Sequence, residues 1–171
     1  MVQLRDKKSK DQEFLELARK VHQITRKKKI PLIINDRVDI AKLMDAEGVH
    51  LGEEDLPVKE ARKILGSKKI IGASASDIKT AKIKEKEGAD YIGLGPVFET
   101  GSKKIEKPLG VDILRDAKKA LKIPVFPIGG INQCNLDQII STGTMRIAVI
   151  SAIFSATDVK KASQELLKRL K

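Results

Sequence analysis

Residues Leu32–Asp55, LIINDRVDIAKLMDAEGVHLGEED, contain two short apolar runs with a helical pattern between them. The runs are Leu32–Ile34 and Val49–Leu51, and amide or acidic side chains follow each of them closely. The helical pattern comes from apolar residues spaced three or four apart, at Ile40, Leu43 and Met44. We therefore predict a strand, a helix and a second strand, with the two strands parallel because a helix connects them.

Two carboxylates follow the two predicted strands. Asp36 comes after the first strand and Asp55 after the second. Because the carboxyl ends of neighbouring parallel strands lie at one edge of a sheet, we expect these two side chains to meet there. Mg²⁺ prefers oxygen ligands and completes its shell with water and substrate phosphates, so Asp36 and Asp55 are candidate magnesium ligands. An alternative of equal weight is that both acids are ordinary loop residues that cap helices.

The same alternation of apolar runs and helical segments continues along the chain. The seven apolar runs are Val2–Leu4, Pro31–Ile34, Gly48–Leu51, Lys69–Ala73, Asp90–Leu94, Ile123–Ile128 and Ile147–Ile150. Helical spacing recurs between and after them, at Phe14, Leu17, Ala18 and Val21, at Val111, Leu114, Ala117 and Leu121, and at Val159, Ala162, Leu166 and Leu170. Such alternation predicts a single α/β domain over residues 1–171 with buried parallel strands.

The last two apolar runs favour a (β/α)8 TIM barrel over an open sheet. The run that ends at Ile128 is followed by Gly129 and Gly130, and the run that ends at Ile150 is followed by Ser151. Glycine lets a backbone approach a phosphate closely, and loops after strands 7 and 8 are the usual phosphate site of this barrel. Seven runs are one fewer than the eight strands of a complete barrel, so we expect seven parallel strands.

Composition limits the classes of partner. The net charge is +11, but lysines occur in every predicted helix and the chain has only one Tyr and four Phe to stack on bases. A lysine-rich solvated surface therefore explains the charge better than nucleic-acid binding does. The single cysteine, Cys134, excludes an internal disulfide and fits a reducing compartment. No apolar run is long enough to span a bilayer, so we expect a cytoplasmic protein with no membrane or nucleic-acid partner.

Two further segments offer groups that could bind an anion. Gln3, Arg5 and Lys7 alternate, so one face of the first strand presents an amide and two cations. The alternative there is a frayed terminus with solvated charges. Ser74 ends the strand that contains Ile70, where its hydroxyl could donate to a phosphate, although a helix-capping serine would have the same position.

The loop Gly93–Lys104, GLGPVFETGSKK, is the richest in such groups. Glycines and a proline shape its turn, and Thr100, Ser102 and Lys103 then supply hydroxyls and an ammonium group. Lysine binds phosphates as a point charge, so this loop suits a phosphate or diphosphate. The alternative is a polar loop without a role.

Together these segments resemble the thiamine phosphate synthase family, whose barrel enzymes join the pyrimidine and thiazole halves of thiamine. The matching motifs are QLRDK at Gln3–Lys7, IIND at Ile33–Asp36, HLGEED at His50–Asp55, IGAS at Ile71–Ser74, GPVFETGSK at Gly95–Lys103, IGGI at Ile128–Ile131 and ISAIF at Ile150–Phe154. The resemblance extends over the whole chain, and motifs in this order at strand ends are more specific than any single one.

The resemblance implies an activity and a set of site residues. The activity is condensation of 4-amino-2-methyl-5-hydroxymethylpyrimidine diphosphate with thiazole phosphate, which releases diphosphate and requires Mg²⁺. The pyrimidine diphosphate would be bound by Gln3, Arg5, Lys7, Asn35, Ser74 and Lys103. The thiazole phosphate would be bound by Thr100, Ser102, Gly130, Ile150 and Ser151. Asp36 and Asp55 would hold the metal, and Arg5, Lys7 and Lys103 would be catalytic because they neutralise the leaving diphosphate. A homo-oligomer is compatible with this assignment.

The chain departs from the family in two places. Met145 and Arg146 replace an Asp-Gly pair before the last strand, which would strain the turn if the glycine needs a positive φ. The family's first strand and helix would precede Gln3, and we expect that unit to be absent here. Two alternatives to the synthase follow: a thiazole tautomerase of the same superfamily, and a phosphate-binding remnant without catalysis. The paired Asn35 and Asp36 together with Asp55 favour the synthase over the tautomerase.

Overall fold

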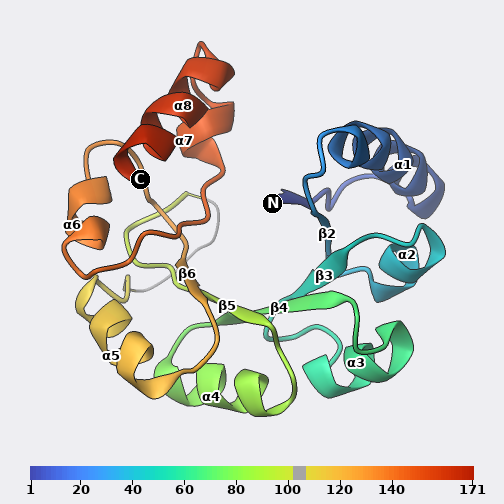
Figure 1. The fold of residues 1–171 in the computed structure, drawn as a ribbon, viewed down its shortest axis with the longest axis horizontal. Helices are drawn as coiled ribbons and strands as arrows, with labels where there is room; N and C mark the ends of the chain where they lie inside the picture. Colours follow the sequence, from blue (N-terminus) through green and yellow to red (C-terminus); the bar gives the residue numbers. More distant parts are fainter. Residues whose placement is uncertain (102–106) are drawn as a thin grey trace. The chain divides into compact units, whose positions relative to one another are not determined.

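The computed structural model describes residues 1–101 and 107–171. Its residues form two compact units, each built from strands and helices that follow one another along the chain (Figure 1). The first unit contains Met1–Ser74 and Lys84–Asp90, and the second contains Ala75–Ile83 and Tyr91–Lys171. Helix α4 (Ile78–Lys86) contributes residues to both. The expectation of one domain over residues 1–171 stays a prediction.

The first unit is a parallel sheet with helices in the connections. Its strands are β1 (Val2–Leu4), β2 (Leu32–Asn35), β3 (Gly48–Leu51) and β4 (Ile70–Ala75). Its helices are α1 (Asp11–Lys27), α2 (Val38–Leu43) and α3 (Val58–Leu65). Each strand pairs in parallel with the next one along the chain, so the carboxyl ends of all four lie at one edge. The predicted strand–helix–strand reading of residues 32–55 is confirmed.

The core of this unit is aliphatic on both faces of the sheet. Leu32, Ile33 and Ile34 in β2 are fully buried, as are Val49 and Leu51 in β3. Strands buried on both faces are continuous apolar runs, which explains why the sequence shows runs rather than alternation here. Helix α1 adds the buried side chains of Phe14 and Ala18 to this core.

Two acidic side chains fix the amino ends of the strands. The Leu32 N–H donates to Glu47 Oε2 at 2.8 Å, and the Ile71 N–H donates to Asp90 Oδ2 at 2.7 Å. Arg62 of α3 then binds the same Asp90 oxygen at 2.6 Å. These contacts satisfy backbone amides at strand ends that would otherwise lack a partner, so we interpret Glu47 and Asp90 as structural residues.

The second unit has the same pattern with fewer strands. Its strands are β5 (Tyr91–Leu94) and β6 (Val125–Pro127), which pair in parallel. Its helices are α5 (Asp112–Ala120), α6 (Leu136–Ile140), α7 (Ser151–Phe154) and α8 (Val159–Arg169). The predicted face of α5 is confirmed, because Leu114, Ala117 and Leu121 are buried.

The prediction of seven strands is wrong: the described residues form six. The run Ile147–Ile150 makes only an isolated parallel bridge, between Ile128 and Ala148. The Ala148 N–H donates to the Pro127 carbonyl at 2.9 Å, but Pro127 itself has no N–H with which to donate to this run. The ladder therefore lacks one of its bonds, and apolar composition alone does not make this run a strand.

Two local expectations are also corrected. Leu17 and Leu43 were expected on buried helix faces, but both are exposed, because α1 turns Phe14, Ala18 and His22 inward and α2 turns Val38 and Ala41 inward. Arg146 causes no strain: positive φ outside glycine occurs among the described residues at Lys29, Asp36 and Asp45. The Arg146 side chain is exposed. No helix in residues 1–101 and 107–171 has the length and apolarity needed to cross a membrane.

Candidate active site

Three neighbouring strands of the first unit present polar side chains on one face at their carboxyl ends. The register places Asn35 of β2 beside His50 of β3, and His50 beside Gly72 of β4. Ser74 lies two residues beyond Gly72 and therefore shares its face. Asn35, His50 and Ser74 thus form a row across the sheet, which we call the polar row.

Asp36 follows the polar row directly and has an unusual backbone. Its φ is 63°, and its N–H donates to the His50 carbonyl at 2.8 Å. Aspartate tolerates this left-handed conformation better than most residues do. The turn is needed because the chain must leave β2 and enter α2 within three residues, at Val38.

The Asp36 carboxylate lies among charged groups of both signs. Lys7 Nζ lies 3.7 Å from Asp36 Oδ2. Burial raises the pKa of Asp36, and the Asp55 carboxyl raises this pKa further through a hydrogen bond and charge repulsion, while Lys7 and Arg5 oppose the shift. The structure therefore brings Asp36 and Asp55 together, as the parallel strand order predicted, and it places Lys7 and Arg5 near Asp36.

Asp55 is held in place by its own loop. The Gly52 N–H donates to Asp55 Oδ2 at 2.6 Å, and a Cβ at Gly52 would lie 2.7 Å from the same oxygen. Glycine at position 52 therefore leaves the room that the carboxylate occupies. The Asp55 carboxyl also hydrogen-bonds to the Asp36 side chain.

The pair fits a divalent cation. Two carboxylates within hydrogen-bond reach repel one another when both are ionised, and a cation between them removes this repulsion. Within the described part of the chain, no group of three or more His, Cys, Asp or Glu side chains gathers around a common point. A cation held by Asp36 and Asp55 would thus keep coordination positions for water and substrate phosphate, which is the preference of Mg²⁺.

His50 is a site residue to which the sequence interpretation gave no role. Its Nε2 lies 3.0 Å from Ser74 Oγ. Burial lowers the pKa of His50 to about 4, against a smaller opposing effect of Asp55, so the imidazole is neutral near neutral pH. The available signal was its position: His50 stands in register with Asn35, which is apparent only once the pairing of β2 and β3 is known.

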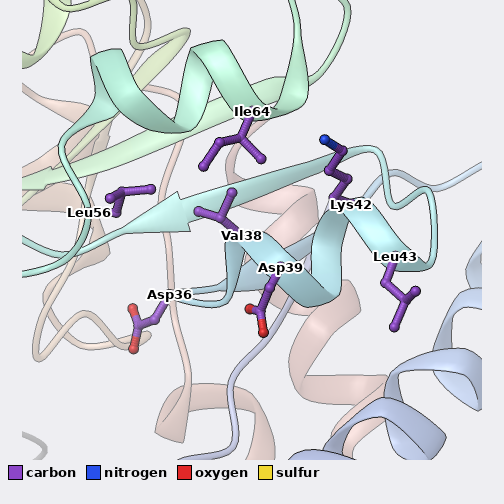
Figure 2. A pocket seen from close by; sticks show the side chains of 7 residues that line it. All are labelled: Asp36, Val38, Asp39, Lys42, Leu43, Leu56 and Ile64. Atoms are coloured by element: carbon purple, nitrogen blue, oxygen red, sulfur yellow. The ribbon is translucent and has the colours of Figure 1, made fainter.

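A groove beside Asp36 has a different character. It has a volume of about 690 Å³ and is lined by Asp36, Val38, Asp39, Lys42, Leu43, Leu56 and Ile64. Figure 2 shows Val38, Leu56 and Ile64 between α2 and α3, with Asp36 just before α2. Four of its seven lining side chains are aliphatic and two are acidic, so Lys42 is the one cation that this lining offers to a diphosphate.

In the second unit the candidate phosphate site is built from backbone more than from side chains. Gly130 has a φ of 67°, and a Cβ there would clash with the Glu99 carbonyl and with Phe98. The Val97 N–H donates to the Ile128 carbonyl at 2.9 Å, and the Phe98 N–H donates to the Gly129 carbonyl at 3.2 Å. The loop after β5 (residues 95–101) is therefore packed closely on the loop after β6 (residues 129–131). We call these two segments the glycine loops.

The remaining predicted site residues lie at the ends of helices and strands or in loops. Gln3 and Arg5 are exposed at the end of β1, and Ile150 and Ser151 are exposed at the start of α7. Thr100 is half-buried in the loop after β5. Ser102 and Lys103 lie outside the described residues. The roles given to all of these residues stay predictions.

Comparison with known proteins identifies relatives along almost the whole chain. Residues 1–153 match the family described as thiamine monophosphate synthase. A thiamine-phosphate synthase of Clostridium tetani is 48% identical over 97% of this chain and 79% of its own length. The thiamine-phosphate synthase of Methanobrevibacter smithii is 46% identical over 100% of this chain and 82% of its own length.

Solved structures agree with these matches. The thiamine phosphate pyrophosphorylase from Pyrococcus furiosus superposes with a TM-score of 0.89 at 41% identity, over 98% of this chain and 80% of that one. A 3-hexulose-6-phosphate synthase superposes with a TM-score of 0.70 at 15% identity, which shows a shared fold only. The TIM-barrel-like α/β class is therefore confirmed.

Proposed function

The chain belongs to the thiamine monophosphate synthase family, and we propose which of its residues carry out the family's reaction. Its function is that of a thiamine-phosphate synthase, a transferase of thiamine biosynthesis. The reaction joins 4-amino-2-methyl-5-hydroxymethylpyrimidine diphosphate to thiazole phosphate. A carbon–oxygen bond to the diphosphate breaks, a bond from the same carbon to the thiazole nitrogen forms, and diphosphate leaves.

The observation that supports the assignment of roles is the meeting of Asp36 and Asp55 beside Lys7 and Arg5. We assign Asp36 and Asp55 to Mg²⁺, which would supply positive charge to the leaving diphosphate when it is bound. Arg5 and Lys7 add fixed positive charge at the same edge of the sheet. Charge that is already in place before the reaction stabilises a developing anion without reorganisation, so these groups act on the transition state.

The polar row would bind the pyrimidine diphosphate. Asn35 and Ser74 offer an amide and a hydroxyl on one face of the sheet, and Gln3 lies on the same face of β1 because it pairs with Ile33. Lys103 would add a further cation to the diphosphate. These residues bind and orient the substrate, and none of them needs to transfer a proton.

The second unit would bind the thiazole phosphate. The glycine loops pack on one another where a Cβ would not fit, at Gly130 in particular. Hydroxyls from Thr100, Ser102 and Ser151, and the backbone at Ile150, would complete this site. Glycine in these loops would also let the backbone approach the phosphate closely, because it has no side chain.

No general base is assigned. The aminopyrimidine is electron-rich and can support positive charge on its methylene carbon as the diphosphate leaves. The thiazole nitrogen is already a nucleophile, so the protein has only to hold the two substrates in line. The reaction therefore depends on binding and on charge, which agrees with a site that holds cations, carboxylates and hydroxyls.

The remaining assignments concern the setting of the enzyme. It acts on small molecules. We infer a cytoplasmic location, a single domain and no nucleic-acid partner, on the basis of its composition. A homo-oligomer is compatible with these assignments.

A coupled assay tests the proposal directly. The purified protein is incubated with both substrates and Mg²⁺, and thiamine phosphate and diphosphate are measured together. We expect the two products in equal amounts. Isomerised thiazole without thiamine phosphate would instead support the tautomerase alternative. Binding of diphosphate by calorimetry without either product would support the phosphate-binding remnant.

A further inference from the structure

We propose that His50 is a positioning residue of the synthase reaction, which orients the Ser74 hydroxyl toward the diphosphate of the pyrimidine substrate. The inference rests on the role proposed above for Ser74. It begins from the contact between His50 Nε2 and Ser74 Oγ, at 3.0 Å. It assigns to His50 an action on a substrate-binding group rather than on the substrate.

The sheet register explains why these two side chains meet. His50 is level with Gly72 on the neighbouring strand, and Ser74 is the next residue on the same face. Gly72, level with His50 and two residues before Ser74, has no side chain on this face. The contact is thus a product of register, and His50 is buried with only 7% of its surface exposed.

The direction of the hydrogen bond decides what Ser74 can do. A hydroxyl has one proton to donate. If Ser74 gave that proton to His50, it would present only lone pairs to the substrate, and lone pairs repel a phosphate oxygen. If the Nε2–H of His50 donates to Ser74 Oγ, the Ser74 proton remains for the anion. We therefore assign the Nε2–H tautomer to His50, with Ser74 donating to the diphosphate.

His22 is a matched control within the same unit. It is also buried, with 5% of its surface exposed, and its Nε2 lies 3.1 Å from Glu47 Oε1. Glu47 accepts the Leu32 N–H at the amino end of β2, so this pair lies at the opposite end of the strands from the polar row. His22 therefore shares burial and a polar partner with His50, but has no contact with the proposed substrate groups.

The experiment is a double-mutant cycle on the full chain with Mg²⁺. The variants are His50→Leu, His50→Gln, Ser74→Ala and the double variant His50→Leu/Ser74→Ala, with His22→Gln as the control. Leucine is similar in size and has no donor, whereas the glutamine amide can place an N–H close to the position of Nε2. The readouts are kcat, the KM of each substrate separately, and the urea unfolding curve.

We expect His50→Leu to lower kcat/KM for the pyrimidine diphosphate roughly 3- to 10-fold, the range of one lost hydrogen bond. The KM of thiazole phosphate should stay unchanged, and His50→Gln should recover most of the loss. In the Ser74→Ala background, His50→Leu should add less than about twofold, because its partner is already gone. His22→Gln should lower stability without changing either KM.

Three results would overturn the assignment. The losses of kcat/KM in His50→Leu and Ser74→Ala could multiply in the double variant, or His50→Gln could be no more active than His50→Leu. The third is an equal rise in the KM values of the two substrates in His50→Leu. If His50→Leu does not fold, His50→Asn replaces it, since its amide is one bond too short to reach Ser74. If the wild type makes thiamine phosphate but the effects of the changes at positions 50 and 74 are independent, only the proposed role of His50 is rejected. A wild type that makes no thiamine phosphate removes the proposed function, and the role of His50 with it.

Discussion

The polar row and the glycine loops, our two proposed anion sites, are built in opposite ways. In the polar row and its neighbours Asp36 and Asp55, side chains supply charge and hydrogen bonds, and the backbone only sets their register. In the glycine loops the backbone makes the close contacts, and the absence of side chains at Gly129 and Gly130 is what lets the two loops pack. A conservative side-chain change should therefore alter chemistry in the first region and structure in the second.

The largest effect is expected from Gly130→Ala. Its Cβ would clash with the Glu99 carbonyl and its φ is positive, so the added methyl group meets both crowding and backbone strain. Together these should cost about 3 kcal/mol or more in the free energy of unfolding. Gly110→Ala is the matched control, because φ at Gly110 is +72° but nothing lies within 4 Å of its Cβ. The loss of unfolding free energy is measured in urea for both variants, and the difference between the two losses gives the cost of crowding alone. Equal losses would contradict the close packing of the loops.

A change in the polar region should leave the fold intact and remove activity. Asp55→Asn keeps the shape of the side chain, retains an acceptor for the Gly52 N–H and removes one of two repelling carboxylates. We expect kcat/KM to fall about 100-fold or more, the scale for loss of one electrostatic group at a reacting centre. The metal-free protein should be no less stable than wild type.

The control for this variant is Glu54→Gln, a change of the same charge at an exposed neighbouring residue. It should stay within about twofold of wild type, as surface changes usually do. Magnesium should raise the melting temperature of wild type and of Glu54→Gln but not of Asp55→Asn. A magnesium-induced shift in Asp55→Asn equal to that of wild type would argue against the metal assignment.

The smallest effect is a difference in pH dependence between two carboxylates of the first unit. Burial, with the repulsion from Asp55, raises the pKa of Asp36, so the folded state holds this proton more strongly than the unfolded chain does. Its ionisation therefore lowers stability as pH rises through the interval above the ordinary value of 3.8. Asp36→Asn should be more stable than wild type at neutral pH without metal, and the difference should vanish in acid.

Glu47 should show the opposite sign. Burial alone would raise its pKa, but the Leu32 N–H and His22 together hold the pKa below the usual value of 4.5. Its ionised form therefore stabilises the fold above that value, and this stability is lost as pH falls. Glu47→Gln should be less stable than wild type at neutral pH and equal to it in acid. Unfolding curves across this pH range compare both variants, and differences of the same sign would contradict the two assignments.

The sequence predicted the local elements well. Three of the strands begin or end where apolar runs were predicted, at Val2, Leu4, Gly48, Leu51 and Leu94. The family and its activity were also predicted from ordered motifs and are confirmed. The failure at Ile147–Ile150 has a specific cause: strand formation there depends on what the neighbouring strand can donate, and Pro127 has no N–H.

The alternation of strands and helices and the residue types at the strand ends follow from the amino-acid order alone, because periodicity and turn residues act over a few neighbours. Which of those side chains meet depends on how the strands pair. The tertiary structure placed Asp36 against Asp55 and His50 against Ser74, and it kept His22 and Glu47 at the other end as structural residues. The physical reason is register: pairing between strands far apart in the chain is set by burial of the whole sheet, and a shift of one residue would turn each of these side chains to the other face.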